Sequence, residues 1–525
     1  METKEDWNQD NDTFTEQSNQ FLTWLTQDAK LTISSKISLR DLRGLNQGRA
    51  IVATADIDKG ELLFEIPRDS ILNIATSQLV QDFPKVKPSL EIELGQWEGL
   101  IVCLSYEWLV LGSSSKWWPY LRVLPPGGKG SLNTLVYWSE EELSLLRPSL
   151  VLNRIGEQGA GEMFDRVMEF IDKHGLKSIL KDTLSWDEFL HIASVVMSYS
   201  FDVERSHEVG NSDVENSSDD EDNDASYLKS MVPFADMLNA DTKKCNANLV
   251  YGSSSLTMRS TKPIASGEQV YNTYGEYPNS EILRRYGYVE WDGSLYDFGE
   301  VLLDNIKEAL RESFHVTQET IDECLMILQN DDKIVELLDG TEIVTDAYDC
   351  YISGEILTEM VALIQIMCTV LQTPDQTYLQ EPTLRRHMER VAKKCIQLIE
   401  TGAVTQKCVD VWKLSIDKRL AMYPGETGRS TKEEEEGEEV GTTRDDRSKA
   451  KSETLRQSMA STVLIGEFNA LSKCRDSLEK QYKVIDDDRL LNNVLKRKLV
   501  ETESGGSHGH RPSGKRAKRV NPNGS

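Results

Sequence analysis

The spacing of apolar residues changes repeatedly along this chain of 525 residues. Short strand-like runs separated by glycines occupy residues 37–72 and return at 228–300, whereas residues 77–198 carry apolar residues at helical spacing, as in WEGLIVCLSYEWLVLG. From residue 301 onward the helical spacing continues in runs such as EILTEMVALIQIMCTVLQ. We therefore expect an α+β fold, in which a β-rich core is split by a helical insertion and followed by an all-α C-terminal domain.

Charge and composition place the boundaries of these regions. We expect a disordered polar lead at residues 1–20 and a core domain at 21–300, with its insertion at about 77–198. A helical substrate-binding domain should follow at 301–500, and a disordered basic tail at 501–525. Two acidic runs predict disordered loops at about 204–226 and 425–452, because blocks of like charge stay solvated. The alternative is that these runs steer a basic substrate toward the protein.

The composition limits the classes of partner. A formal net charge of −28 argues against a direct role in nucleic-acid binding, since phosphates are bound by clustered Lys and Arg, and it favours a basic protein partner. The eight cysteines include no C-x-x-C pair and the seven histidines no HExxH pair, so we expect neither a metal site nor a disulfide framework. The N-terminus has no signal-peptide pattern and no window reaches eighteen apolar residues, which predicts a soluble intracellular protein without membrane contact.

One segment, residues 231–288, carries polar and aromatic residues at separations that neither a helix nor a strand explains. It begins MVPFADMLNADTKKCNANLVY and continues through GEQVYNTYG to RRYGY. Asp236 and Asn239 are one helical turn apart, so a short helical turn would show both polar groups on one side. Tyr274 and Tyr286 lie in turn-rich sequence with further tyrosines beside them. This spacing indicates a site rather than a core.

These steps resemble the C-terminal half of the SET-domain protein lysine methyltransferases, and the match extends from about Gly44 to about Tyr423. The helical insertion and the helical region after the core are similar to one subclass, the relatives of the Rubisco large-subunit lysine methyltransferase. Within this subclass PFADMLNA, with Ala240 where the pattern usually has His, is closest to the fungal ribosomal lysine methyltransferase branch. The resemblance implies methyl transfer from S-adenosyl-L-methionine to a protein lysine.

Methyl transfer requires an aligned donor and acceptor and a lysine that arrives unprotonated, which an apolar channel favours. The resemblance implies that Tyr274 is catalytic, with its hydroxyl beside the transferred methyl. It implies that Tyr286 is also catalytic and shares the methyl-transfer pore, and that both tyrosines pack near the cofactor. The alternative for each is an ordinary aromatic residue of a half-buried sheet or turn.

The PFADMLNA step predicts one part of the cofactor site. By the resemblance, Asn239 and Ala240 hold the positions of an Asn-His pair that binds the cofactor, and Asp236 lies beside them. Backbone hydrogen bonds from residue 240 would survive the replacement of His. The alternative for Asp236 is a helix N-cap or a turn former.

Two other segments predict the rest of the cofactor site. The Gly-rich turn in RGLNQGRAIVA resembles a turn that wraps the methionine portion of the cofactor, so Gln47, Gly48 and Arg49 are expected to supply main-chain hydrogen bonds. The alternative is that this turn is an ordinary hairpin without a role in binding. The run MSYSFDV matches an S-R-x-F-like segment, which puts Ser198 and Tyr199 on the cofactor side.

The same resemblance predicts three residues for the substrate. Ser200 and Asp202 of MSYSFDV would face the substrate channel, and Trp117 of KWWPYL matches an aromatic residue of that channel. The alternative for Trp117 is packing of the insertion against the core.

The C-terminal tail, LKRKLVETESGGSHGHRPSGKRAKRVNPNGS, has two basic clusters separated by a Gly/Ser-rich linker. This pattern is compatible with a bipartite signal for a nuclear import receptor, and it predicts a protein of the nucleus that also occurs in the cytoplasm. The alternative is a generic basic tail with weak nucleic-acid affinity.

Taken with the resemblance, these patterns predict an S-adenosylmethionine-dependent enzyme that monomethylates a protein of the large ribosomal subunit. One alternative differs only in substrate, which would be a histone or another nuclear protein. The other is a catalytically silent SET-like module that binds partners through its helical domain. Cofactor binding separates this second alternative from the enzyme.

Overall fold

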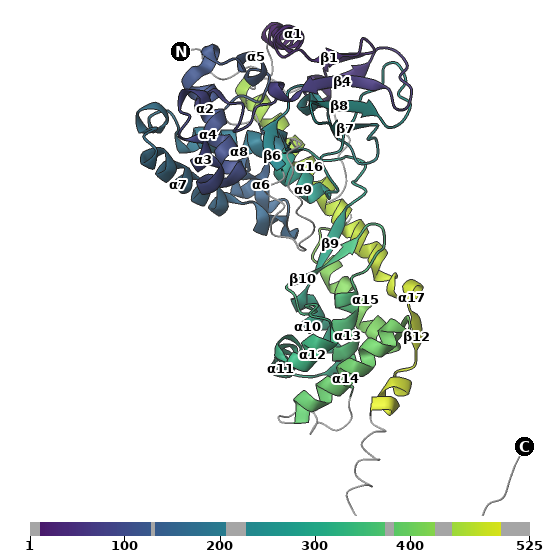
Figure 1. Ribbon diagram of the computed structural model, residues 1–525. Coiled ribbons are helices and arrows are strands. Elements are labelled where there is room, and N and C mark those ends of the chain that lie inside the picture. The colour runs from purple at the N-terminus through teal and green to yellow at the C-terminus, as the bar shows by residue number, and fades with distance from the viewer. Residues whose placement is uncertain (1–10, 128–131, 206–226, 373–382, 426–443, 495–525) are drawn as a thin grey trace, which may run out of the picture. The chain divides into compact units, whose positions relative to one another are not determined.

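The computed structural model describes residues 11–127, 132–205, 227–372, 383–425 and 444–494 (Figure 1). Residue contacts divide the chain into two compact units. The first comprises Met1–Gly299, Tyr351–Ser353 and Met422–Ala470, and the second comprises Glu300–Cys350, Gly354–Ala421 and Leu471–Ser525. The division after residue 299 lies next to the boundary expected from sequence, whereas residues 422–470 group with the first unit.

The first unit contains an antiparallel four-stranded sheet with the strand order β1-β4-β8-β7. Its strands in that order are Thr32–Ile33, Leu62–Pro67, Ser255–Ser260 and Ala247–Tyr251. Two antiparallel strand pairs also belong to this unit, namely β2 (Ile37–Asp41) with β3 (Arg49–Ala53), and β5 (Ser200–Glu204) with β6 (Tyr227–Met231). The sheet therefore joins sequence from before and after the insertion, since β4 pairs with β8.

Helices form the insertion and flank the sheet in the first unit. They are α1 (Asn11–Gln27), α2 (Gln78–Asp82), α3 (Lys87–Ser89), α4 (Gly95–Ser105), α5 (Trp118–Leu121), α6 (Glu140–Ser144), α7 (Glu157–Lys173), α8 (Trp186–Tyr199) and α9 (Asn279–Tyr286). Helix α4 is buried along its whole C-terminal part, residues 98–105, because its sequence is apolar on nearly every side. The expected α+β core split by a helical insertion is confirmed.

One hydrophobic core joins the sheet, α1 and the insertion. Phe64 and Ile66 of β4 are buried while Glu65 between them is not, as the two-residue period of a strand requires. The ring of Phe64 meets the ring of Phe234 edge to face, with centroids 4.9 Å apart. Phe234 has a positive φ of 79°, so this packing holds a backbone conformation that few non-glycine residues adopt. The strained residue lies directly before the turn that carries Asp236.

Two expectations of disorder are wrong where the structure describes the chain. Helix α1 begins at Asn11, inside the lead expected at residues 1–20, because Phe14 is only 3% exposed and anchors the helix on the core. Helix α16 (Arg444–Arg475) begins inside the loop expected at 425–452. The remaining parts of these two segments, most of the loop at 204–226 and the tail at 501–525 lie outside the described residues.

The second unit is mainly helical. It contains α10 (Leu303–Phe314), α11 (Gln318–Asn330), α12 (Asp332–Leu337), α13 (Thr358–Leu371), α14 (Thr383–Glu400), α15 (Gln406–Leu420) and α17 (Leu478–Gln481), with β11 (Ala403–Thr405) parallel to β12 (Lys483–Ile485). Strands β9 (Phe298–Leu302) and β10 (Ala347–Tyr351) form a further pair. Helix α13 is buried from residue 360 to 371, which is the pattern of a central helix. The expected helical C-terminal region is confirmed.

A second hydrophobic cluster lies within the first unit and involves α16. It consists of Leu135, Trp138, Leu146, Val151, Leu283, Val289, Met459, Ala460 and Val463. Leu283 and Val289 stand on either side of the RRYGY tyrosines, so the segment that carries these tyrosines is anchored at both ends by packing that includes α16. Across the described ranges, no helix is long and apolar enough to cross a membrane.

Candidate functional site

Three tyrosines form a cluster, and two of them contact residues 238–240. The ring centroid of Tyr274 lies 4.7 Å from that of Tyr286 and 6.2 Å from that of Tyr288, the second contact being edge to face. The hydroxyl of Tyr274 donates a hydrogen bond to the Leu238 carbonyl at 2.8 Å, and the hydroxyl of Tyr288 donates to the Ala240 carbonyl at 3.3 Å. Two tyrosine hydroxyls and two backbone carbonyls thus form a small region rich in oxygen atoms with aromatic walls.

Local geometry explains why the RRYGY tyrosines face the same region. Helix α9 ends at Tyr286, and Gly287 closes it in the left-handed conformation with φ 71° and an amide hydrogen bond to the Leu283 carbonyl. A Cβ at residue 287 would lie 2.8 Å from the backbone of Asn133 and Thr134. Only glycine satisfies both requirements, the positive φ and the close approach.

Burial keeps these tyrosines neutral. It raises the pKa of Tyr274, Tyr286 and Tyr288 well above the usual value for a phenol, and neighbouring tyrosines add to the effect. At neutral pH each hydroxyl therefore remains protonated and acts as a hydrogen-bond donor. The cluster can orient and polarise groups, but it cannot act as a tyrosinate base.

Asp236 lies on the short 3-10 turn η10 (Ala235–Met237), where it is 5% exposed. Its Oδ2 accepts a hydrogen bond of 2.5 Å from the hydroxyl of Tyr120 in α5, while its Oδ1 is buried without a partner among the described residues. Burial raises the pKa of Asp236 to about 8, although the Tyr120 hydrogen bond opposes the shift. We conclude that the carboxyl is largely protonated at neutral pH, which lowers the cost of its burial.

Asn239 connects two of the predicted cofactor segments. Its side-chain Nδ2 donates to the Gln47 carbonyl at 3.2 Å and to Gln269 Oε1 at 2.6 Å. The neighbouring Ala240 forms a parallel bridge with Asn272. Because η10 ends at Met237, Asn239 does not share a helical face with Asp236, and the expectation that one turn shows both side chains together is wrong.

The Gln47–Gly48–Arg49 turn lies beside this amide. Gly48 has φ 59° and accepts a hydrogen bond on its carbonyl from the amide of Leu42 at 2.7 Å, which closes the turn before β3. A Cβ at Gly48 would meet no atom within 4 Å, so the backbone there faces open space. Burial lowers the pKa of Arg49 to about 10, and nearby Arg43 lowers it further.

Ser198 and Tyr199, at the end of α8, lie at the same site. The Ser198 hydroxyl donates to the Arg285 carbonyl at 2.7 Å, which ties α8 to the residue before Tyr286. Burial raises the pKa of Tyr199 to about 12, and Asp236 raises it further while Arg49 lowers it. Tyr199 therefore interacts electrostatically with both the buried carboxyl and the arginine of the turn.

The structure does not bring the three predicted substrate residues together. Trp117 is only 1% exposed and packs edge-on against Trp24 of α1, with ring centroids 5.8 Å apart, as the packing alternative requires. Asp202 of β5 is exposed and forms an ion pair of 2.6 Å with Lys229 on the paired strand β6. Ser200 begins β5 opposite Met231.

Sequence reasoning missed several partners of the site. Gln269 binds Asn239 and also donates to Gln47 Oε1 at 3.0 Å and to the Tyr271 hydroxyl at 2.9 Å. Tyr120, in the KWWPYL run, is the hydrogen-bond donor to Asp236, and no sequence pattern indicated this contact. The signal that could have identified Gln269 is its place two residues before Tyr271 in GEQVYNTYG, where strand alternation points both side chains the same way.

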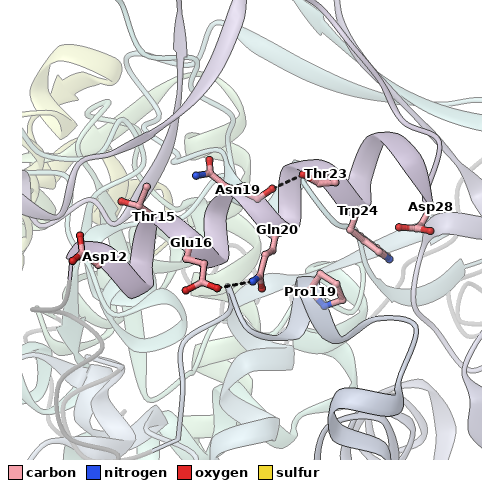
Figure 2. Close-up of a pocket in the computed structure, with 9 residues that line it drawn as sticks. All are labelled: Asp12, Thr15, Glu16, Asn19, Gln20, Thr23, Trp24, Asp28 and Pro119. Carbon is pink, nitrogen blue, oxygen red and sulfur yellow. Dashed lines mark hydrogen bonds between the residues drawn. The ribbon is translucent and has the colours of Figure 1, made fainter.

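A hollow of about 630 Å³ lies elsewhere, along the outer side of α1 (Figure 2). Its lining consists of Asp12, Thr15, Glu16, Asn19, Gln20, Thr23, Trp24, Asp28 and Pro119. Figure 2 shows mostly polar side chains of one helix, and the tyrosine cluster does not contribute to it. Volume alone therefore does not identify the site in this chain, whereas the convergence of neutral hydroxyls and backbone carbonyls does. The described residues also contain no group of acidic residues, His or Cys that could hold a metal ion.

Sequence comparison identifies one family and two relatives. The family model described as the SET domain matches residues 48–275. The chain is 47% identical over 494 residues to ribosomal lysine N-methyltransferase 4 of Saccharomyces cerevisiae, covering 94% of this chain and 98% of the yeast protein. It is 33% identical over 278 residues to N-lysine methyltransferase setd6 of Danio rerio, covering 52% of this chain and 56% of that relative.

Solved structures with the same fold include that of Rubisco LSMT bound to AdoMet, with a TM-score of 0.55 and 17% identity, covering 93% of this chain and 99% of that one. A second is the crystal structure of the SET domain of LSMT bound to lysine and AdoHcy, with a TM-score of 0.54 and 18% identity, covering 94% of this chain and 99% of that one. At this level of identity the likeness establishes the fold.

Proposed function

This chain belongs to the SET-domain protein lysine N-methyltransferases, and we propose that it adds one methyl group to a lysine of a protein of the large ribosomal subunit. The similarity to the yeast ribosomal lysine N-methyltransferase 4 supports a ribosomal substrate, because it extends over nearly the whole of both chains. It therefore includes the helical second unit as well as the SET core.

The observation that supports the activity is the cluster of Tyr274, Tyr286 and Tyr288, in which the Tyr274 and Tyr288 hydroxyls donate to the Leu238 and Ala240 carbonyls. A lysine ε-amine must lose its proton before it can attack, and a channel that excludes water beside a positively charged sulfonium disfavours the charged ammonium form. Neutral hydroxyls and carbonyl oxygens then fix the direction of the amine. Positioning of this kind, without a dedicated base, is what an in-line displacement requires.

The residues present also fit the cofactor. S-adenosyl-L-methionine supplies a methyl group on a positively charged sulfonium. The Gln47–Gly48–Arg49 turn offers open backbone at Gly48, and the Asn239 side chain holds this turn next to residue 240. Together they form a polar wall beside the tyrosine cluster, as a nucleoside with an amino-acid tail requires.

The charge of the chain supports a basic substrate. Ribosomal proteins carry many lysines and arginines, and a net charge of −28 favours their association with this enzyme. Two basic clusters in residues 495–525 support passage to the nucleus through an import receptor, where a ribosomal protein is met before or during assembly. A histone or other nuclear protein is the second substrate class compatible with these features.

The test is transfer of labelled methyl from S-adenosylmethionine into purified large-subunit ribosomal proteins, with core histones in parallel and Tyr274→Phe as the inactive control. Label on one ribosomal protein, lost in the control, is the expected result, and intact-mass measurement of that protein counts the methyl groups. Label on histones alone would reject the ribosomal substrate. Failure of the protein to bind S-adenosylmethionine would favour the silent SET-like module.

A further inference from the structure

The guanidinium of Arg49 is buried in the first unit, and one of its nitrogens makes no hydrogen bond to the described residues. Arg49 is 8% exposed; its Nε donates to the Ser18 hydroxyl at 3.0 Å and its Nη1 to the Val123 carbonyl at 2.9 Å. Its Nη2 is buried and has no hydrogen-bond partner among the described residues. A buried donor of a charged group without an acceptor is costly, so this nitrogen calls for an acceptor that the folded chain does not supply.

The nearby carboxyls do not meet this need. Asp41, opposite Arg49 in the β2–β3 pair, is bound by Arg43, whose Nε donates to Oδ1 at 3.0 Å and Nη2 to Oδ2 at 2.8 Å. That pairing lowers the pKa of Asp41, so its negative charge is already matched. Asp236 is bound to Tyr120 and largely protonated at neutral pH. The positive charge of Arg49 is therefore left without a dedicated anion.

The position of Arg49 identifies the missing anion. Arg49 follows directly after Gly48, whose backbone faces open space, and Asn239 holds the turn at residue 47. The guanidinium also lies close enough to Tyr199 for the two side chains to affect each other's pKa. An unmatched cation thus lies near Tyr199, one of the residues predicted on the cofactor side, and the cofactor carries one carboxylate, on its methionine portion.

We infer that the Arg49 side chain binds the α-carboxylate of S-adenosylmethionine through Nη2. This assigns a side-chain role to a residue expected from sequence to act through its backbone alone. The inference rests on the cofactor named under the proposed function and is independent of the protein substrate.

Helix α1 gives the guanidinium a fixed direction. The Phe14 ring lies between two guanidinium groups, with its centroid 3.7 Å from Arg43 Cζ and 3.9 Å from Arg49 Cζ. Ser18, one turn further along α1, accepts from Arg49 Nε. A guanidinium held on both sides in this way loses little rotamer freedom when a carboxylate binds, which favours affinity.

The test compares two ligands by calorimetry, S-adenosylmethionine and decarboxylated S-adenosylmethionine, which lacks only the carboxylate. The full-length protein should bind the decarboxylated ligand at least about tenfold more weakly, as expected for a charge-assisted hydrogen bond. Arg49→Met should bind S-adenosylmethionine about tenfold more weakly than the unaltered protein does, whereas its affinity for the decarboxylated ligand should change by no more than about twofold. Arg49→Lys, which retains the charge, should keep part of the discrimination.

The matched control is Arg122→Met. This variant also removes a guanidinium that contacts α1, where Arg122 Nη1 donates to Gln20 Oε1 at 2.9 Å, but it leaves Asp41 bound to Arg43, so discrimination between the ligands should be unchanged. Equal binding of both ligands by the unaltered protein would overturn the inference whether or not a variant folds. An equal loss for both ligands in Arg49→Met would overturn it too, because the residue would then be structural. Binding of neither ligand would instead remove the cofactor premise, and with it this inference.

Discussion

The hydroxyl of Tyr274 donates a 2.8 Å hydrogen bond to the backbone carbonyl of Leu238. These residues lie far apart in sequence, one in the GEQVYNTYG step and the other just after the turn that carries Asp236. Burial raises the pKa of Tyr274, so its hydroxyl stays protonated and its oxygen keeps lone pairs for a second contact. The hydrogen bond thus fixes the position of that oxygen within the tyrosine cluster.

Replacement of this hydroxyl is the most direct test of the site. We expect Tyr274→Phe to lower kcat about a hundredfold or more, since removal of one preorganised polar group costs that much in comparable sites. Affinity for S-adenosylmethionine should stay within a few fold, because the cofactor segments are held by Asn239 instead. Single-turnover kinetics and calorimetry measure the two effects separately.

Tyr296→Phe is the matched control for that substitution. Tyr296 also donates through its hydroxyl, to Glu276 Oε1 at 3.2 Å, but this contact is exposed and outside the tyrosine cluster. We expect its turnover to match that of the unaltered protein. Undiminished turnover in Tyr274→Phe would show that the hydroxyl has no part in the reaction.

Asp236 makes the stability of the first unit depend on pH. Its pKa is about 8 in the folded protein and near 3.8 when unfolded, so between these values the unfolded chain releases a proton that the folded chain retains. The contribution of Asp236 to the free energy of unfolding is therefore greatest below about pH 3.8, and it falls by a few kcal/mol as pH rises toward 8.

Asp236→Asn measures this dependence, because an amide oxygen can still accept from Tyr120 but does not titrate. Thermal unfolding of both proteins between pH 5 and pH 8 should give a difference in midpoint that shifts steadily in favour of the variant as pH rises. A difference that does not change with pH would mean that the carboxyl is ionised in the folded protein.

Gly287 tests whether the RRYGY tyrosines depend on close packing. Gly287→Ala would place a methyl group 2.8 Å from the Asn133 and Thr134 backbone at a positive φ, so we expect a loss of roughly 3 kcal/mol or more in stability and reduced turnover. Gly267→Ala also has a positive φ, but its Cβ would meet no atom within 4 Å, so only about 1 to 2 kcal/mol should be lost. Equal losses measured by denaturant unfolding would assign the whole effect to backbone conformation.

Short continuous motifs predicted residues that the structure brings together. The tyrosines at 274 and 286 and the Asn239 step each lie in such a motif, and Tyr274 packs against Tyr286 and donates to the Leu238 carbonyl, next to Asn239. The turn at Gly48 was likewise predicted from sequence, and its glycine has the positive φ that a tight turn needs. Fold class followed from the change in apolar spacing.

Contacts between distant segments were not predictable in the same way. Tyr120 and Asp236 are separated by 116 positions, and Arg49 and Ser18 by 31, so no spacing rule connects them. Trp117 was expected in a substrate channel, but sequence does not reveal that Trp24 packs against it. The expectation of a disordered lead failed for the same reason, because Phe14 becomes an anchor only once Arg43 and Arg49 are in place.

Arg456 of α16 joins this helix to the insertion through Asn133, Tyr137 and Glu142. It is 7% exposed, forms an ion pair of 2.7 Å with Glu142, and its Nε donates to Asn133 Oδ1 at 3.3 Å. Asn133 is also the residue whose backbone abuts Gly287. A substitution at Arg456 should therefore change the positions of the tyrosines, because it loosens the backbone against which Gly287 packs.

We expect Arg456→Met to lower stability by about 3 kcal/mol, because Glu142 is then left as a mostly buried charge without its partner. Turnover should fall while S-adenosylmethionine affinity changes little, and hydrogen exchange should increase at residues 283–289. Adding Glu142→Gln should restore part of the stability, since the unpaired charge is gone. If exchange at residues 283–289 stays unchanged while stability falls, then α16 supports the fold without positioning the tyrosines.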